Sequence, residues 1–337
     1  KAGIPVFGPS KAAAQLEGSK VFAKDLMKKY NIPTAAYGVF HKVDEAKAFI
    51  AQTGAPIVVK ADGLAAGKGV IVAMTIDEAN VAVEDMLSGN RFGDAGSTVV
   101  IEEFMEGEEA SLLAFVDGKT VVPMIASQDH KRIFDGDKGP NTGGMGTYAP
   151  APVLTDALRD AAMKTILEPM VAAMEKEGMP YVGCLYAGLM ITDEGPKVVE
   201  FNARFGDPET QVVLPLLDSD LGEIMMACAK GTLTSNMVKW KDSSAACVIL
   251  ASKGYPETSS KGDVISGDIK QYDTTIVFHS GTKLVGENYV TNGGRVLGVV
   301  GLGKDLRTAL DRAYERIEHI DFEGMQYRTD IGAKAFK

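Results

Sequence analysis

The chain has 337 residues, of which 45% are hydrophobic and 24% are charged, and its formal net charge at pH 7 is −10. Its length leaves room for two or three domains of ordinary composition. The negative charge argues against a nucleic-acid-binding protein, which normally carries a basic surface. No apolar run reaches the roughly 20 residues that span a bilayer, so no membrane partner is expected.

The cysteines and the first residues bear on the cell compartment. Cys184, Cys228 and Cys247 form no Cys-x-x-Cys pair, which predicts free thiols rather than disulfides or a zinc site. The chain opens Lys1-Ala2-Gly3, with neither a methionine nor the apolar stretch of a signal peptide. We therefore expect a cytoplasmic enzyme whose front part is absent, present as a monomer or a weak dimer.

The predicted elements alternate irregularly between strands and helices. Residues 4–8 indicate one strand without a partner, which suggests that an earlier domain is missing. Ser10 can cap a short helix to residue 16, Ser19 can cap a helix to residue 29, and Thr75 begins a capping box. Further strands are predicted at residues 57–60, 70–73, 99–103, 111–116 and 120–125.

The second half of the chain continues this mixture. A long helix is predicted over residues 156–176, bent at Pro169 because proline lacks a backbone donor. Residues 240–244 are polar and indicate a boundary. Beyond them, strands are predicted at residues 246–251, 275–278 and 295–300, followed by an amphipathic helix over residues 304–320. The pattern indicates α+β domains around a central cleft.

An acid, an amide and an arginine follow one another at alternate positions at the end of a predicted strand. Because successive strand residues face opposite ways, Glu200, Asn202 and Arg204 should project from one face. Two oxygen ligands suit Mg²⁺ on a polyphosphate, and the guanidinium can meet charge on a transferred phosphoryl group. The alternative is a strand end with a solvated salt bridge.

A lysine- and glycine-rich loop connects the strands predicted at residues 57–60 and 70–73. It is not a P-loop, because three residues separate Gly63 from Gly67 and Gly69 replaces the Ser or Thr that follows the lysine. Its backbone N–H groups could cover a triphosphate, with Lys60 as a phosphate partner. A mobile surface hairpin is the alternative.

Three further segments could bind ligands. The strand edge at residues 101–109 could offer backbone groups to an adenine, although an acidic, solvated strand end explains it equally well. Residues 127–132 and 139–146 are too long for a plain turn, and loops of this size are usually functional or disordered. Within them Asp129 could hold a substrate ammonium group, and a Gly-Gly backbone could approach a substrate closely.

Residues 204–211, Arg-Phe-Gly-Asp-Pro-Glu-Thr-Gln, resemble the signature of the phosphoribosylamine–glycine ligase family of the ATP-grasp superfamily. The resemblance extends over essentially the whole chain. It includes residues 16–20, the lysine-glycine loop, residues 127–132 and the Pro-Asn-Thr-Gly-Gly-Met-Gly run at residues 140–146. It implies an ATP-grasp fold, in which two α+β subdomains grip ATP, followed by a small C-terminal α/β domain.

The resemblance also implies domain boundaries. Residues 1–23 would be a remnant of an N-terminal domain, and residues 24–240 the ATP-grasp domain, with residues 40–110 as its lid. Residues 241–337 would form the C-terminal domain.

The implied activity joins glycine to 5-phosphoribosylamine with ATP and Mg²⁺ or Mn²⁺, in purine synthesis, through a glycyl phosphate. Arg204 and Asp129 would be catalytic, and Glu200 and Asn202 would hold the metal. The residues implied to contact ATP are Lys24, Lys60, Gly67, Lys68, Gly69, Glu102, Glu103, Phe104 and Glu109. The residues implied to contact the other substrates are Asp129, Asn141, Gly143, Gly144, Asp207, Lys283 and Arg295.

Two departures from the family keep alternatives open. The family's N-terminal domain is not in this sequence, and residues 185–190 lack the third acidic metal ligand found in many ATP-grasp enzymes. One alternative is another ATP-grasp carboxylate–amine ligase or carboxylase. The other is a nucleotide-binding fragment without activity.

Overall fold

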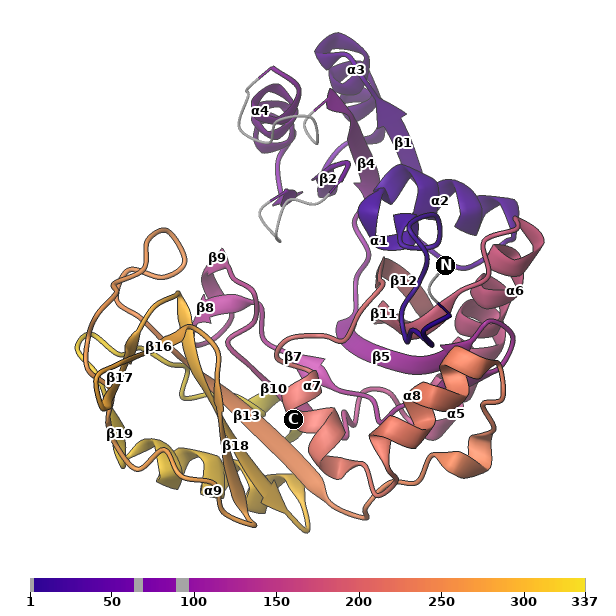
Figure 1. The fold of residues 1–337 in the computed structure, drawn as a ribbon. Coiled ribbons are helices and arrows are strands. Elements are labelled where there is room, and N and C mark those ends of the chain that lie inside the picture. The colour runs from indigo at the N-terminus through magenta and orange to yellow at the C-terminus, as the bar shows by residue number, and fades with distance from the viewer. Residues whose placement is uncertain (1–2, 64–68, 89–96, 337) are drawn as a thin grey trace. The chain divides into compact units, whose positions relative to one another are not determined.

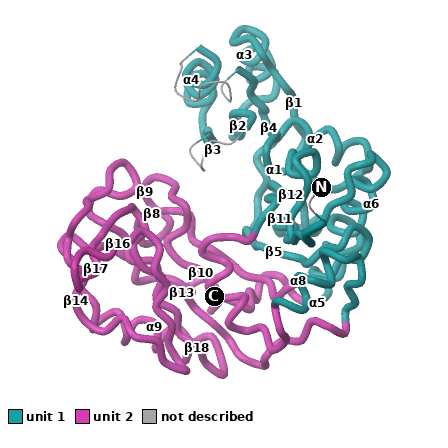
Figure 2. The backbone as a smooth tube through the Cα atoms, in the orientation of Figure 1, with its two compact units in different colours: residues 1–123, 156–204, 222–235 teal, residues 124–155, 205–221, 236–337 magenta. Residues whose placement is uncertain are grey.

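The computed structural model describes residues 3–63, 69–88 and 97–336, and the chain divides into two compact units (Figures 1 and 2). Unit 1 comprises residues 1–123, 156–204 and 222–235, and unit 2 comprises residues 124–155, 205–221 and 236–337. Each unit is therefore assembled from three separate stretches of the chain.

One part of unit 1 is a four-stranded antiparallel sheet, in the order β1-β4-β2-β3, with two helices packed on it (Figure 1). The apolar residues of β2 and β4 form one buried cluster with Ala46 and Ile50 of one helix and Val83 and Met86 of the other. Thr75 caps the second helix in a complete capping box, as predicted. The elements are β1 (Tyr37–Phe40), α3 (Val43–Thr53), β2 (Ile57–Ala61), β3 (Val70–Ala73), α4 (Ile76–Leu87) and β4 (Val99–Glu103).

The other part of unit 1 is a second antiparallel sheet, in the order β12-β11-β5-β6. The long predicted helix forms in three pieces, with a π-helical segment directly before the last piece, in which Pro169 is the second residue. The interruption lies directly before the residue that lacks a backbone donor, and the bend itself stays a prediction. The elements are α1 (Gln15–Gly18), α2 (Lys20–Lys29), β5 (Glu108–Asp117), β6 (Val121–Pro123), α5 (Asp156–Ala162), the π-helix Met163–Leu167, α6 (Glu168–Lys176), β11 (Val182–Thr192), β12 (Gly195–Asn202) and α8 (Leu221–Lys230).

Two predictions near the N-terminus are wrong. Residues 4–8 form no strand; instead Phe7 packs its ring against Phe115 of β5, with the ring centroids 6.4 Å apart. The helix expected from Ser10 starts later, as α1 at Gln15, although Ser10 Oγ does accept a hydrogen bond from the Ala13 amide. A β-like composition cannot supply the neighbouring backbone that a strand needs. The cap at Ser19 is confirmed, since its side chain accepts from the Phe22 amide.

Unit 2 is built on a five-stranded sheet, in the order β15-β18-β13-β10-β7, with a helix packed on β18 and β13. The predicted strands and the amphipathic helix of this region all form. The elements are β7 (Gln128–Asp129), β8 (Arg132–Phe134), β9 (Lys138–Asn141), β10 (Gly146–Ala149), α7 (Thr210–Val213), β13 (Ser244–Ala251), β14 (Ser266–Gly267), β15 (Thr275–His279), β16 (Thr282–Val285), β17 (Asn288–Thr291), β18 (Arg295–Gly303), α9 (Leu306–Ile317) and β19 (Ile320–Asp321).

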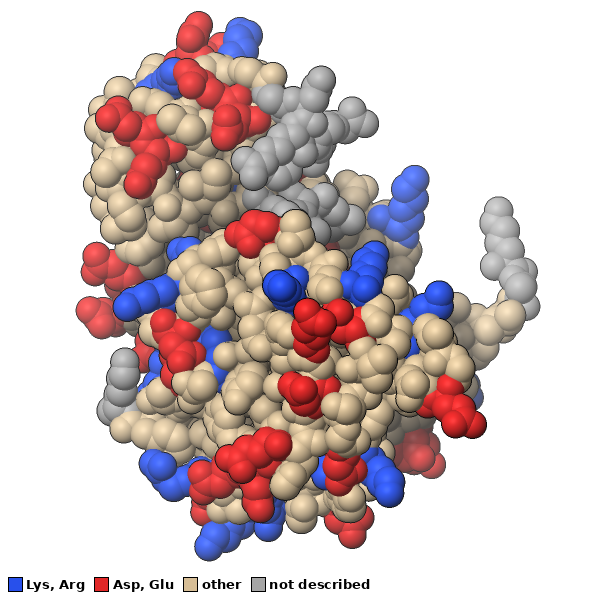
Figure 3. Space-filling model, turned by 90° about the vertical axis from the view of Figure 1, so that its left-hand side faces the viewer, with Lys and Arg blue, Asp and Glu red and all other residues tan. Residues whose placement is uncertain are grey.

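The three cysteines are free and buried. Burial raises the pKa of the Cys228 thiol to about 12, and it raises the pKa values of Cys184 and Cys247 as well. Among the residues that the structure describes, no helix is long and apolar enough to cross a membrane. On the face drawn in Figure 3, acidic and basic side chains are interspersed.

Candidate active site

Strand β12 carries the predicted acid, amide and arginine at its end. Asn202 Nδ2 donates to Glu200 Oε1 at 3.4 Å, and Arg204 Nη2 donates to Asn202 Oδ1 at 3.4 Å. The three side chains therefore share one face, as the alternation along the strand predicted. Glu17 holds the arginine from α1, with Arg204 Nε 3.0 Å from Glu17 Oε1, while the Arg204 side chain remains 55% exposed.

Glu102 of β4 binds two predicted phosphate-contacting lysines at once. Its Oε2 atom lies 2.8 Å from Lys24 Nζ and 2.9 Å from Lys60 Nζ, and all three side chains are nearly fully buried. Lys24 Nζ also donates to Thr34 Oγ1 at 2.8 Å, and Lys60 Nζ donates to the Val199 carbonyl at 3.2 Å. This last hydrogen bond fixes the Lys60 side chain to β12 at Val199, the residue directly before Glu200.

A third lysine, which sequence reasoning did not assign to the site, lies at the start of α2. Lys20 Nζ donates to the Gly63 carbonyl at 2.9 Å, where the lysine-glycine loop begins. Burial lowers the pKa of Lys20, and the negative charge of Glu200 opposes this shift. The side chain therefore lies within electrostatic reach of the β12 carboxylate. Its position directly after the Ser19 cap was the signal that could have drawn attention to it.

Asp62 connects the same loop to α2. Its Oδ1 atom accepts from the Val21 amide at 3.2 Å and from Ser19 Oγ at 3.2 Å. A carboxylate at a helix N-terminus satisfies amides that lack an intrahelical partner. The first residue of the loop is thus anchored to the helix that carries Lys20. Gly67 and Lys68 lie outside the described residues, and the Gly69 carbonyl accepts from the Ala61 amide at 2.8 Å.

The remaining predicted ATP contacts follow the end of β4. Glu103 is exposed and pairs through its backbone with Ala36, its amide donating to the Ala36 carbonyl at 2.9 Å. Phe104 is half-buried, and Glu109 lies exposed on β5 opposite Met190 of β11. The adenine and ribose contacts expected of Glu103, Phe104 and Glu109 stay predictions.

Unit 2 brings together three predicted substrate-contacting residues. Arg295 Nη1 donates to the Gly143 carbonyl and to the Asp207 carbonyl, each at 2.9 Å, and Arg295 Nη2 lies 2.9 Å from Asp207 Oδ2. Gly144 has φ +113°, and a Cβ placed there would lie 2.5 Å from Pro208 Cδ. A glycine is required at this position for both reasons.

The other predicted substrate contacts are more scattered. Asp129 is buried and its Oδ2 atom lies 2.5 Å from Lys131 Nζ. Asn141 and Lys283 are exposed on β9 and β16. The structure thus groups Gly143, Asp207 and Arg295 by direct contact.

The chemistry of Glu200 and Asn202 fits a magnesium ion. In the described part of the chain, no group of three or more His, Cys, Asp or Glu side chains could hold a metal. Magnesium does not need one, because it commonly takes one or two protein oxygen ligands and completes its shell with substrate phosphates and water. A carboxylate beside an amide, flanked by cationic groups, is a donor set of this kind.

Unit 1 consists of two parts, each an antiparallel sheet with helices, and it carries Glu200, Asn202 and Arg204 at the end of a strand. This arrangement defines an ATP-grasp enzyme. A family profile described as "Phosphoribosylglycinamide synthetase, ATP-grasp (A) domain" matches residues 18–210, and the profile "Phosphoribosylglycinamide synthetase, C domain" matches residues 245–334. The chain belongs to the phosphoribosylamine–glycine ligase family.

Individual relatives agree with this assignment. The chain is 55% identical over 336 residues to a phosphoribosylamine–glycine ligase of Neisseria meningitidis, covering 99% of this chain and 79% of the relative. It is 54% identical to one of Halalkalibacterium halodurans, covering 99% of this chain and 77% of that protein. The crystal structure of the Thermotoga maritima ligase matches with a TM-score of 0.89 and 38% identity, covering 97% of this chain and 82% of that one.

A biotin carboxylase domain from Hydrogenobacter thermophilus shares only the fold, with a TM-score of 0.75 and 17% identity over 96% of this chain and 70% of that one. The predicted family, ATP-grasp fold and ligase function are confirmed. The roles of individual residues are not tested by these matches.

Proposed function

We propose that the chain joins glycine to 5-phosphoribosylamine at the expense of ATP, giving glycinamide ribonucleotide, ADP and phosphate. The observation that carries the proposal is the face of β12, where Glu200, Asn202 and Arg204 are in contact, with the buried Lys60 fixed one residue away. Family membership supplies the substrates. We place the activity in the cytoplasm and expect a monomer or a weak dimer.

The boundaries predicted from the sequence are kept in this proposal. Residues 1–23 are the remnant of a preceding domain, residues 24–240 the ATP-grasp domain with residues 40–110 as its lid, and residues 241–337 the C-terminal domain.

The groups of unit 1 are proposed to bind the nucleotide. Lys60 and Lys20 neutralise phosphate charge, together with the backbone of the loop through Gly67, Lys68 and Gly69. The Oε1 atom of Glu102 is buried and has no hydrogen-bond partner within the described residues. A buried acceptor of this kind requires a donor, and an adenine amino group supplies one. Glu103, Phe104 and Glu109 remain the proposed adenine and ribose contacts.

Glu200 and Asn202 are the proposed ligands of Mg²⁺ or Mn²⁺. When bound, the ion neutralises charge on the phosphates of ATP. Arg204 then acts on the transferred phosphoryl group, since its guanidinium is fixed on one edge by Glu17 and is still half-exposed. A preorganised cation at the developing charge stabilises the transition state without reorganisation.

The reaction proceeds in two balanced steps. A glycine carboxylate oxygen bonds to the γ-phosphorus of ATP as the bond to ADP breaks, giving glycyl phosphate. The amine nitrogen of phosphoribosylamine then bonds to the carbonyl carbon, phosphate leaves, and the nitrogen loses a proton. In unit 2, Asp129 is proposed to hold the glycine ammonium group, and Gly143, Gly144, Asp207 and Arg295 to contact the substrates with Asn141 and Lys283.

Turnover with each substrate omitted in turn tests the proposal. We expect ADP release that requires both glycine and phosphoribosylamine generated in the assay, with glycinamide ribonucleotide identified by mass spectrometry. ADP release of equal rate with a different amine acceptor would overturn the proposal in favour of another ATP-grasp ligase. Nucleotide binding without any turnover would favour a non-catalytic module.

A further inference from the structure

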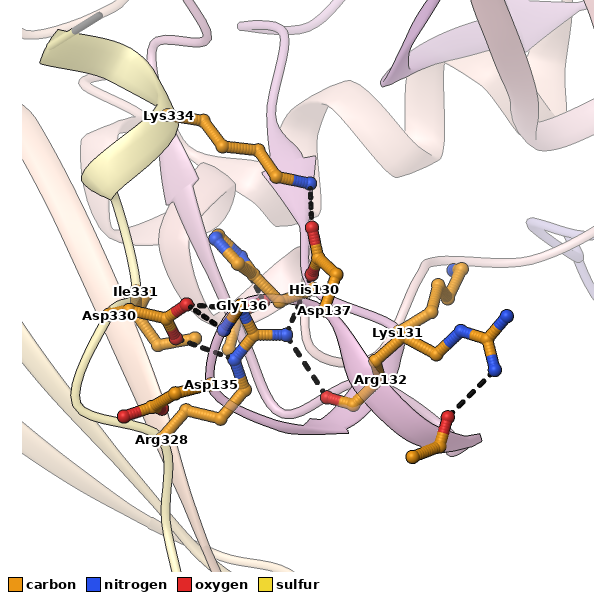
Figure 4. A network of polar contacts seen from close by, with 12 residues as sticks. His130, Lys131, Arg132, Asp135, Gly136, Asp137, Arg328, Asp330, Ile331 and Lys334 are labelled. Carbon is orange, nitrogen blue, oxygen red and sulfur yellow. Dashed lines mark hydrogen bonds and ion pairs between the residues drawn. The ribbon is translucent and has the colours of Figure 1, made fainter.

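The last residues of unit 2 form a polar network around the hairpin of β8 and β9 (Figure 4). Arg328 is 1% exposed, and its Nε and Nη2 atoms donate to Asp330 Oδ1 and Oδ2 at 2.7 and 2.8 Å. Its Nη1 atom donates to Asp137 Oδ1 at 2.8 Å and to the Arg132 carbonyl at 3.1 Å. One guanidinium therefore joins the C-terminal segment to the first residue of β8, Arg132, and to the last residue of the hairpin turn, Asp137.

The same segment contacts every residue of that turn. The Gly136 amide donates to Asp330 Oδ2 at 2.8 Å, and the Thr329 amide donates to Asp135 Oδ1 at 2.9 Å. Lys334 Nζ lies 2.6 Å from the second oxygen of Asp137. We call residues 328–334 the C-terminal clamp.

The turn adopts a backbone that needs this support. Gly136 and Asp137 have φ values of +69° and +54°. The second value is uncommon for a residue with a side chain. Contacts that fix Asp137 from two sides therefore hold a conformation that the sequence alone favours weakly.

The clamp also reaches the other end of the loop that follows the hairpin. A Cβ placed on Gly146 would lie 2.6 Å from Ile331 Cδ1, so the clamp packs directly on this glycine. The Ile331 amide donates to the Tyr314 hydroxyl, which in turn donates to the Arg328 carbonyl at 3.0 Å. Helix α9 thus braces the clamp, and the clamp contacts both ends of residues 135–146.

Arg328 is buried, whereas the carboxylates of Asp330 and Asp137 that it binds are 26% and 37% exposed, and this network argues for positioning rather than for stability. Well-packed apolar residues often replace a buried ion network without loss of stability. A network that fixes a strained turn beside a ligand loop instead reduces the ordering that must occur when the ligand binds. Asn141, Gly143 and Gly144 all lie within the segment whose two ends the clamp holds.

We propose that Arg328 and Asp137 are positioning residues, which hold the loop of residues 139–144 ready for glycine or phosphoribosylamine without touching either substrate. This inference rests on the proposed function only in that residues 139–144 contact a substrate other than ATP.

The test compares Asp137→Asn with a matched control, Asp268→Asn. Asp268 pairs with Arg316 at 2.5 Å in the same unit, and its side chain is 34% exposed against 37% for Asp137. We expect Asp137→Asn to raise the KM for glycine or phosphoribosylamine by about tenfold, the size of effect that loss of a charge-assisted hydrogen bond produces. The KM for ATP and kcat should stay within about twofold. The control should leave all three KM values unchanged.

Hydrogen exchange over residues 133–146 supplies a readout independent of activity. It should accelerate in Asp137→Asn and not in the control. Adding Lys334→Met to Asp137→Asn should change nothing further, because Lys334 acts through that carboxylate. Should Asp137→Asn fold poorly, Thr329→Val removes only the hydroxyl contact to Asp135 and should accelerate exchange in the same residues.

Asn141→Ala separates this inference from the proposed function. A raised substrate KM in Asn141→Ala with normal values in Asp137→Asn overturns the positioning role and leaves the function standing. Unchanged KM values in both variants overturn the assignment of the loop itself. Unchanged hydrogen exchange in Asp137→Asn shows that no clamp operates.

Discussion

Glu102 Oε2 lies 2.9 Å from Lys60 Nζ in a pair that is almost completely buried. Because Lys24 Nζ lies 2.8 Å from the same oxygen, two lysines share one carboxylate. Burial lowers the pKa of Lys24 against the opposing charge of Glu102, as expected of a positive charge that a shared carboxylate compensates only in part. Burying an uncompensated charge is costly. A bound anion would offset that cost, which gives Lys60 an energetic reason to bind phosphate.

Glu102→Gln should destabilise the protein by about 3–5 kcal/mol, since it leaves two buried lysines without a counter-ion. Lys24→Met should cost less, because one lysine and one carboxylate then remain as a neutral pair. Urea denaturation of both variants measures the difference. Equal losses in the two variants would contradict the idea that Glu102 is the shared counter-ion.

Lys20→Met and Lys24→Met should differ in nucleotide binding. Lys20 donates only to a loop carbonyl among its described hydrogen bonds, whereas Lys24 is held by Glu102 and Thr34. Lys20→Met should weaken ATP binding roughly 10- to 100-fold, the value of a hydrogen bond to a charged group. Lys24→Met should mainly lower stability. Calorimetric titration with a non-hydrolysable ATP analogue checks this, and stronger loss in Lys24→Met would restore Lys24 as the direct phosphate contact.

Glu200→Gln and Asn202→Ala should lower turnover about 100-fold or more at limiting Mg²⁺, because the ion stabilises the transferred phosphoryl group by several kcal/mol. Thermal stability should change little. Glu194→Gln is the control, since Glu194 lies just before β12, is 78% exposed and forms an ion pair with Lys197 on the strand. Activity titrated against Mg²⁺ is the measurement, and a normal titration curve in either site variant would reject that residue as a ligand.

Gly144→Ala should abolish most substrate turnover while the fold persists. The φ of +113° and the contact with Pro208 both exclude a side chain at this position. Gly286→Ala is the matched control, since its φ is +59° and a Cβ placed there would meet no atom within 4 Å. Steady-state kinetics with circular dichroism should show normal activity in the control alone. Comparable activity in both variants would remove the Gly-Gly segment from the site.

His130 should make stability depend on pH. Burial, with the positive charges of Arg328 and Lys334, lowers its pKa from 6.5 to about 4, against the opposing charges of Asp129 and Asp137. Between pH 6.5 and 4 the unfolded chain therefore binds a proton that the folded chain does not. Stability should fall as the pH drops through this window, by up to roughly 3 kcal/mol, and His130 should contribute no further change below it.

His130→Gln isolates this contribution. The stability difference between wild type and variant, measured by urea denaturation at pH 7.5 and 4.5, should shrink or reverse at the lower pH. A difference that is the same at both values would mean that His130 titrates normally in the folded protein.

Two of the three local capping signals predicted the start of their helix, whereas the helix expected from Ser10 starts later, at Gln15. Ser19 and Thr75 cap the helices expected of them, because a cap depends on residues three positions away. The alternation of Glu200, Asn202 and Arg204 likewise follows from strand geometry. By contrast, the strand expected at residues 4–8 failed because strand formation depends on a distant neighbour.

The missed residues were those whose roles come from tertiary contacts. Lys20 gained its place from Gly63 and Glu200, and Arg328 from Asp137, which lies 191 positions earlier in the chain. Neither contact leaves a periodic pattern. The family resemblance carried the assignment of the site further than periodicity could, and that assignment did not include Lys20.

The three buried cysteines should be unreactive toward thiol-specific labelling reagents. Thiolates are the reactive form of cysteine, and the raised pKa values of Cys184, Cys228 and Cys247 keep all three protonated at neutral pH. Maleimide reagents should therefore not react with these three thiols in the folded protein. A cysteine introduced at an exposed position, such as Asn141 or Lys283, would be the single labelling site, so a fluorophore could report loop motion without first engineering the native thiols away.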